Sequence, residues 1–342
     1  MPGMIMSSAV GRVAIAGGAK PGETDQENAN QFYGVSLNAL FTDAILACQI
    51  YLKMGPSTFV KYREPGIPFT GEVRTRLREN RHTHIFVQAG EGAGLNSYLE
   101  ANMKTVIADP KFNLTKKAEV LYATTTHLIR ELLNQPSSSD ELRRVKRVVE
   151  SCAELILSQP RVLGSIIDAI SIDYYTYTHS VNVMTYSIAL AKCFGYPEGQ
   201  ELLDVAQAAL LHDIGKQRVD PKITNKDGPL TEDEFEQMKQ HPSLGFGSLK
   251  KSGEIEEQVL NSVLHHHEKL DGNGYPDGLS DGDIDLTVRV VTCADIYDAL
   301  TTRRVYRKAY RSFPALRMMK ETLSFHLDER VFREFVRMLG EV

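Results

Sequence analysis

Apolar residues recur at helical spacing from about residue 115 onward, and this pattern restricts the fold more than any other feature. One helical stripe is formed by Leu121, Leu128, Ile129, Leu132 and Leu133. Further patterns of this kind cover about 174–193, 200–212, 255–266 and 286–300. Thr231 and Glu234 form a capping box that predicts another helix running toward His241. The sequence therefore predicts a mainly α fold.

The region before these helices has a different character. Ile50, Leu52 and Met54 alternate with polar residues, and segments 59–62 and 84–87 are similar β-type runs, whereas 74–78 is helical in pattern. We expect a small α/β domain at 32–113 with a regulatory or interaction role. Residues 17–31 are rich in Gly and polar residues, and we expect 1–31 to form a flexible N-terminus.

Two further regions complete the predicted organisation. Residues 114–172 form a helical connector, broken by the sequence Gln-Pro-Ser-Ser-Ser at 135–139. Such a connector either transmits a signal or holds a homodimer together, and the alternative is that it only packs against its neighbours. Residues 173–342 form the second, all-helical domain.

Composition excludes several classes of function. The formal net charge of −5 over 342 residues provides no general field for the phosphates of duplex nucleic acid. No apolar run is long enough to span a membrane. The four cysteines are scattered without a CxxC pair, as is typical of buried thiols in a reducing compartment. We expect a cytoplasmic protein with no duplex nucleic acid or membrane partner.

Histidine and aspartate residues gather in the predicted all-helical domain. His212-Asp213 and His266-His267 are adjacent pairs, and imidazole with carboxylate suits a borderline divalent metal. Asp295 lies within an apolar run, so its carboxylate needs a partner, either a metal or an Arg. His179 and His241, taken singly, fit ordinary helix residues better than ligands. No local spacing typical of metal fingers exists, so only tertiary folding brings these groups together.

The residues after His267 form an unusual loop. Gly272 and Gly274 permit close approach of the backbone, and Pro276 fixes its own φ angle. Together they would hold Tyr275 on a rigid rim beside the two histidines. The alternative is a simple surface turn, which Asp-Gly-Asn-Gly satisfies without any function.

These motifs, taken in order, make the region from about Asp173 to Phe335 resemble an HD-GYP domain. This bacterial phosphodiesterase family acts chiefly on cyclic di-GMP. The resemblance rests on Leu211-His212-Asp213-Ile214-Gly215-Lys216, the stretch His266 to Pro276, Ala294-Asp295-Ile296-Tyr297-Asp298 and Arg304-Val305-Tyr306-Arg307. It implies an all-helical HD-type phosphohydrolase domain, preceded here by the helical connector and the small α/β domain.

The resemblance also implies roles for particular residues. Its metal ligands would be His179, His212, Asp213, His241, His266, His267 and Asp295. Asp213 would bridge two metals, and it and Lys216 would be the catalytic residues. Lys216, Arg304 and Arg307 would contact substrate phosphate, as cationic side chains do well, and Tyr275 would shape the binding rim.

Two departures from the family pattern affect these expectations. Some members have Glu four positions before the first histidine and use it to hold a third metal. Tyr175 stands there in this chain, and a phenol is a poor ligand at neutral pH. We therefore expect two divalent metal ions, with iron preferred and manganese possible. Val305 replaces the usual Pro of the Arg-Pro-Tyr-Arg run, which concerns local stiffness more than chemistry.

The expected reaction is hydrolysis of cyclic di-GMP to linear pGpG, and in some members further to GMP, by a hydroxide that bridges the metals. Two alternatives stay open. One is a cyclic dinucleotide receptor with low turnover, or a module that docks a diguanylate cyclase (GGDEF) partner. The other is a hydrolase of a different nucleotide, such as cyclic GMP-AMP. Turnover by metal-loaded protein separates the first alternative from an enzyme, and competing substrates separate the second.

Overall fold

The computed structural model describes residues 32–55, 58–88, 91–134, 139–170, 176–226, 228–302 and 310–341. These residues divide into two compact units, one ending at His127 and the other beginning at Leu128. The division falls within one helix, α5 (Leu114–Asn134). The boundaries expected near residues 31, 113 and 172 stay predictions.

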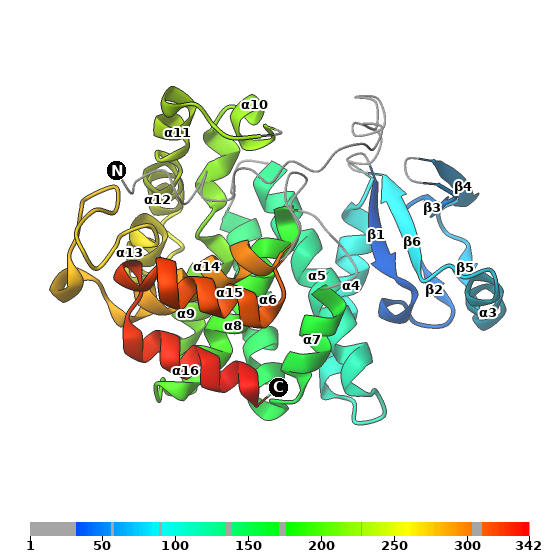
Figure 1. Cartoon of the computed structure of the whole chain (residues 1–342). Helices are drawn as coiled ribbons and strands as arrows, with labels where there is room; N and C mark the ends of the chain where they lie inside the picture. Colours follow the sequence, from blue (N-terminus) through cyan, green and yellow to red (C-terminus); the bar gives the residue numbers. More distant parts are fainter. Residues whose placement is uncertain are drawn as a thin grey trace. The chain divides into compact units, whose positions relative to one another are not determined.

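The first unit contains a four-stranded antiparallel sheet in the order β1-β6-β3-β4 and a two-stranded sheet, β2-β5 (Figure 1). The strands are β1 (Phe32–Ser36), β2 (Ala44–Ile45), β3 (Ile50–Lys53), β4 (Phe59–Arg63), β5 (Pro68–Phe69) and β6 (His84–Gln88). Its helical elements are η1 (Leu37–Ala39), α3 (Gly71–Glu79), α4 (Ala93–Ala108) and the first part of α5. The strands predicted around residues 50, 59 and 84 and the helix at 74–78 are thus confirmed.

Alternating burial explains why these segments pair as strands. Ile85 and Val87 of β6 are fully buried and Ile50 and Leu52 of β3 are buried, while the residues between them are more exposed. The side chain of Thr70 accepts a hydrogen bond from the N–H of Val73 and so caps α3. The apolar face of the sheet therefore supplies much of the core of this unit.

The regular elements of the second unit are all helices among its described residues, apart from one isolated β-bridge between Asp271 and Ser280, in agreement with the predicted fold class. After α5 its α-helices are α6 (Ser139–Ser158), α7 (Val162–Ile170), α8 (Thr176–Cys193), α9 (Gln200–Leu211), α10 (Pro221–Thr224), α11 (Glu232–Met238), α12 (His241–Ser252), α13 (Glu257–His265), α14 (Leu286–Thr301), α15 (Ser312–Thr322) and α16 (Glu329–Gly340). Its short 3₁₀ helices are η2 (Ile214–Arg218), η3 (Asp281–Asp283) and η4 (Ser324–His326).

Helix α8 occupies the centre of this unit, and both its apolar side chains and polar ones such as Asn182 and Thr185 are buried. Val181, Met184 and Ile188 are fully buried, and the helix packs against α6, α9, α14 and α16. Small residues of α9, among them Ala206 and Ala209, are also fully buried, and α9 packs against α8. Helices α15 and α16 cover one side of α14 (Figure 1). The core therefore surrounds the two helices, α8 and α14, that carry His179 and Asp295.

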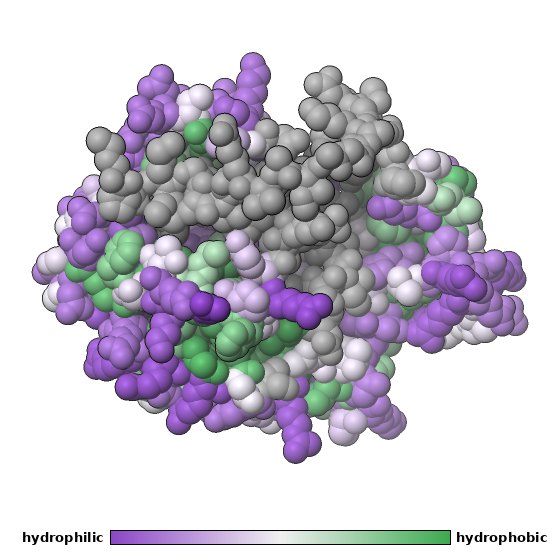
Figure 2. Space-filling view, viewed as in Figure 1, coloured by the Kyte–Doolittle hydropathy of each residue, from purple (hydrophilic) through white to green (hydrophobic). Residues whose placement is uncertain are grey.

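On the face shown in Figure 2, the described residues are largely hydrophilic, with separate apolar spots. The large apolar side chains that are exposed are Ile45, Met54, Val60, Ile67, Phe313, Phe325 and Val336. Isolated apolar residues of this kind are usual on protein surfaces. Among the described residues, no helix has both the length and the apolar character needed to cross a bilayer.

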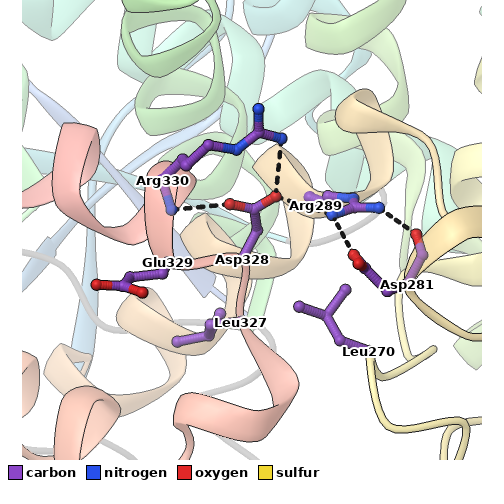
Figure 3. Close-up of a pocket in the computed structure, with 7 residues that line it drawn as sticks. All are labelled: Leu270, Asp281, Arg289, Leu327, Asp328, Glu329 and Arg330. Carbon is purple, nitrogen blue, oxygen red and sulfur yellow. Dashed lines mark hydrogen bonds and ion pairs between the residues drawn. The ribbon is translucent and has the colours of Figure 1, made fainter.

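Arg289 of α14 connects η3 to the start of α16 (Figure 3). Its guanidinium donates hydrogen bonds to the Asp281 carboxylate at 2.7 Å and to the Asp328 carboxylate at 2.8 Å. Asp328 also caps α16 by accepting from the N–H groups of Arg330 and Val331. A cavity of about 490 Å³ lies beside this cluster and is bordered by Leu270, Leu327 and Glu329 as well. It is lined by none of the predicted metal ligands.

We expect Arg289→Met to lower the free energy of unfolding by about 2 kcal/mol, because the side chain of Asp328 is only 5% exposed and loses a charged partner. Urea denaturation measures the change. Arg317→Met is the matched control, since Arg317 is 66% exposed in its pair with Glu321 and should contribute less than about 0.5 kcal/mol. Equal effects of the two substitutions would contradict the structural role assigned to Arg289.

Candidate metal centre

The predicted metal ligands come from five helices of the second unit. Most lie at helix ends, where the backbone turns and a side chain can point across to a neighbouring helix. His179 lies in α8, His212 and Asp213 follow α9, His241 begins α12, His266 and His267 follow α13, and Asp295 lies in α14. The structure brings all seven side chains together, although the first and last are more than a hundred residues apart.

The ligand atoms form two groups of three. His241, His266 and His267 form one group, and His179, His212 and Asp213 form the other. Within each group the potential ligand atoms lie within 4.8 Å of one another. Asp295 belongs beside the second group, because its Oδ1 is 3.0 Å from Nε2 of His179 and 3.9 Å from Nε2 of His212.

Asp213 lies between the two groups. Its Oδ1 is 3.3 Å from Nε2 of His241 and 4.0 Å from Nε2 of His266. Its Oδ2 is 3.5 Å from Nε2 of His212 and 3.7 Å from Nε2 of His179. Each carboxylate oxygen thus faces one group, which is the arrangement that a ligand shared by two cations needs.

Hydrogen bonds to nearby carbonyl groups orient three of the imidazoles in the same way. Nδ1 of His212, His241 and His266 each lies 2.8 Å from the carbonyl oxygen of the residue three positions earlier. This contact keeps the proton on Nδ1 and leaves Nε2 without a proton, as a ligand atom needs; Nε2 of His241 and Nε2 of His266 lie 3.3 Å apart. The helix ends themselves therefore set both the tautomer and the direction of these rings.

His179 is oriented by a carboxylate instead. Its Nδ1 lies 2.7 Å from Oδ2 of Asp298, which is itself held at Oδ1 by Asn182 and Thr302. Burial alone would lower the pKa of His179, but the hydrogen bonds to Asp295 and Asp298 outweigh it and raise the pKa to about 9. A cation bound by Nε2 would replace that proton.

The remaining electrostatics suit a cation as well. Burial lowers the pKa of His241, takes that of His266 well below its usual value and brings that of His267 to about 3, so these rings are neutral. Burial would raise the pKa of Asp213, but Lys216 and the adjacent imidazoles hold it well below the ordinary range. Neutral imidazoles and ionised carboxylates are the protonation states that bind metals.

Two buried nitrogen atoms at this centre have no hydrogen-bond partner among the described residues. They are Nε2 of His212 and Nδ1 of His267. A buried polar atom without a partner is costly, and a metal ion would satisfy it. Together with the donor set of five imidazoles and two carboxylates, these atoms fit a centre for divalent cations.

Lys216 reaches this centre from η2. Its Nζ lies 2.6 Å from Oδ2 of Asp213, and a third of its side chain remains exposed. Gly215 allows η2 to pack closely against the start of α12, because a Cβ at that position would lie 1.9 Å from the carbonyl oxygen of His241. The cationic group therefore lies against Asp213 while part of its side chain is exposed to solvent.

Tyr275 forms a border of the centre. Its ring lies 4.8 Å from the ring of His267, and its N–H donates to the carbonyl of His267. Burial first, and then Asp295 and Asp213, raise the pKa of its phenol well above the usual value, so the phenol is neutral. The predicted position of Tyr275 beside the paired histidines is thus found in the structure.

Some predicted residues lie outside the described part of the chain. Arg304 and Arg307 fall within 303–309, as does Val305, and Tyr175 falls within 171–175. Sequence reasoning also gave no role to Asp298 and Glu268, which the structure buries next to ligands. The signal was present for Asp298, because a carboxylate in an apolar helix needs a partner, as was argued for Asp295.

Comparison with known sequences identifies the family of the chain. A family model described as HD domain matches residues 103–331. A cyclic di-GMP phosphodiesterase of Pseudomonas aeruginosa is 39% identical over 56% of this chain and 46% of its own length. A 3'3'-cGAMP-specific phosphodiesterase of Vibrio cholerae is 30% identical over 74% of this chain and 51% of its own length. The chain thus spans about half the length of these two relatives.

Comparison with solved structures adds the fold. An HDG"Y"P protein from Bdellovibrio bacteriovorus superimposes with a TM-score of 0.67, covering 90% of this chain and 99% of its own, at 20% sequence identity. The similarity of fold agrees with the helical HD-type architecture described above. Since the family model covers more than half of the chain and its motifs meet at one centre, the chain belongs to the HD domain family, in its HD-GYP branch.

Proposed function

We propose that this protein is a metal-dependent phosphodiesterase that hydrolyses cyclic di-GMP to linear pGpG. The observation that carries the proposal is the position of Asp213, with one carboxylate oxygen facing each of two groups of imidazoles. The names of the relatives point to a cyclic dinucleotide as the substrate class.

The residues around the centre have different roles in hydrolysis. Divalent cations, when bound, polarise a phosphodiester and make water more acidic. Lys216 offsets the negative charge that develops on the phosphate, and Tyr275 borders the space in which a base or ribose lies. Arg304 and Arg307 are proposed to bind phosphate oxygens. Water adds across one P–O bond of the ring, which leaves one linear product.

The proposed cations are two iron ions, with manganese as the second choice. The donor set contains imidazole and carboxylate but no thiolate, which suits these metals at least as well as zinc. Metal analysis of protein purified anaerobically, without added metal, tests this choice. Two iron or manganese ions per chain are expected, and zinc alone would contradict it.

The substrate is tested by turnover. Cyclic di-GMP and 3'3'-cGAMP are offered side by side to anaerobic protein, with chelated protein as the blank and chromatography to identify products. The cGAMP arm is included because one relative carries that specificity in its name. We expect cyclic di-GMP to be consumed at least ten times faster, a difference of about 1.4 kcal/mol in transition-state binding, with accumulation of pGpG.

Three other outcomes would each overturn part of the proposal. A preference for cGAMP or for a mononucleotide would reject the substrate. Rapid conversion to GMP would reject pGpG as the final product. Tight binding without turnover by metal-loaded protein would indicate a receptor, although a complete set of ligands argues against that function.

The cellular location and the protein partners are also proposed. We infer a cytoplasmic location, because the free cysteines Cys48, Cys152 and Cys293 are buried as thiols and Cys193 is exposed. A homodimer through the helical connector and a diguanylate cyclase partner remain predictions. Light scattering of the purified chain tests the first of these.

A further inference from the structure

The loop that carries Tyr275 surrounds a buried carboxylate that is not among the predicted metal ligands. We call residues 269–280 the signature loop. Glu268 lies directly before it and directly after His267, and is only 3% exposed. A carboxylate in such a place requires hydrogen-bond donors, because an unpaired buried charge is costly.

The donors are backbone N–H groups of the loop itself. Oε1 of Glu268 accepts from Asp277 at 2.7 Å and from Gly278 at 3.0 Å, and Oε2 accepts from Leu279 at 3.0 Å. Three consecutive amides thus converge on one side chain. Hydrogen bonds to an ionised acceptor are stronger than neutral ones, so this contact fixes the second half of the loop.

The first half of the loop packs against the same residue from another side. A Cβ placed on Gly274 would lie 2.4 Å from Cα of Glu268 and 2.6 Å from its Oε2. Glycine is needed there because no side chain fits between the two segments. Tyr275 follows at once, with its N–H bonded to the carbonyl of His267 and its ring against the His267 ring.

We propose that Glu268 is the positioning residue for the rim of the active site. It holds the signature loop closed around itself and so keeps Tyr275 beside His267, where Tyr275 contacts substrate. Glu268 acts through the loop and does not bind a metal. The role of the rim in binding substrate rests on the proposed function. The contact between Glu268 and the loop does not depend on it.

The far end of the loop is held independently. The N–H of Asp281 donates to the carbonyl of Leu270, and Arg289 binds Asp281 from α14 (Figure 3). Within the loop, the side-chain carboxylate of Asp277 is bound by His265 at 2.9 Å, and its N–H group is not. Loss of the Glu268 carboxylate therefore loosens the rim while these contacts keep the ends of the loop in place.

The test is Glu268→Gln, which keeps the shape but replaces one acceptor oxygen by an NH₂ group that faces an N–H donor. Hydrogen–deuterium exchange of the metal-loaded protein is followed in the peptide covering 269–280. We expect exchange of the amides at 277–279 to become at least about tenfold faster, and other peptides of the unit to stay unchanged. KM for cyclic di-GMP rises about tenfold, kcat changes less, and the metal content is retained.

Glu257→Gln is the matched control, because Glu257 is exposed in the first turn of α13, the helix that leads to the same histidines. It should change neither exchange nor KM. A second variant, Gly274→Ala, leaves Glu268 intact and forces the loop away from it. It should reproduce the faster exchange and the higher KM, and it decides the matter if Glu268→Gln fails to fold.

Each other outcome counts against the inference. Unchanged exchange in both variants would show that Glu268 does not hold the loop. Faster exchange with unchanged KM would show that the rim does not position substrate. Loss of metal from Glu268→Gln would show that Glu268 acts through the ligands instead. If the wild-type protein fails to hydrolyse cyclic di-GMP, the proposed function fails, whereas the exchange result still tests the contact.

Discussion

Asp213→Asn should reduce kcat for cyclic di-GMP by roughly a thousandfold or more, which corresponds to about 4 kcal/mol of lost transition-state stabilisation. The carboxylate faces both groups of imidazoles, with oxygens 3.3 Å from His241 and 3.5 Å from His212. Asparagine keeps the shape, but it has one acceptor oxygen and no charge. We therefore expect at least one of the two cations to be lost.

The measurement combines steady-state turnover with the number of metal ions bound per chain. Asp233→Asn is the control, because Asp233 is exposed in the first turn of α11 and lies outside the centre. It should keep full activity and metal content. An Asp213→Asn protein with two metal ions and nearly normal kcat would refute the position of Asp213 between the two sites.

The local structure around this centre could be predicted from neighbouring residues. The capping box at Thr231 and Glu234 is formed as expected, because both hydrogen bonds join residues three positions apart. The helix that it begins ends at Met238, and a new helix starts at His241 with Pro242 in its first turn. Proline is favoured in the first turn of a helix, so the start of the new helix at His241 also follows from neighbouring residues.

The meeting of the ligands could not be read from spacing. His179 and Asp295 lie in different helices, and only the packing of α14 against α8 brings their atoms to 3.0 Å. Resemblance to a family supplied that expectation. Glu268 shows a second limit, because its partners are backbone N–H groups, which every residue except proline has. No pattern of side chains in the sequence could therefore predict these hydrogen bonds.

Asp298→Asn should weaken metal binding by about a hundredfold, although Asp298 is not a predicted ligand. Oδ1 of Asp298 accepts hydrogen bonds from Asn182 at 2.8 Å and from Thr302 at 2.9 Å. These two donors require an oxygen at that position, so the amide introduced by the substitution would turn its NH₂ group toward His179. Nδ1 of His179 would then have to accept, and its proton would move to Nε2.

A proton on Nε2 would occupy the position from which His179 faces Asp213 and Asp295, so the imidazole would no longer be a ligand. Metal titration, followed by activity at saturating metal, measures the effect: most of the lost activity should return when metal is raised. Asp285→Asn is the control at the start of the same helix, since Asp285 is exposed and its side chain makes no capping hydrogen bond that the substitution could remove. Unchanged metal affinity in Asp298→Asn would mean that Asp298 does not set the tautomer of His179.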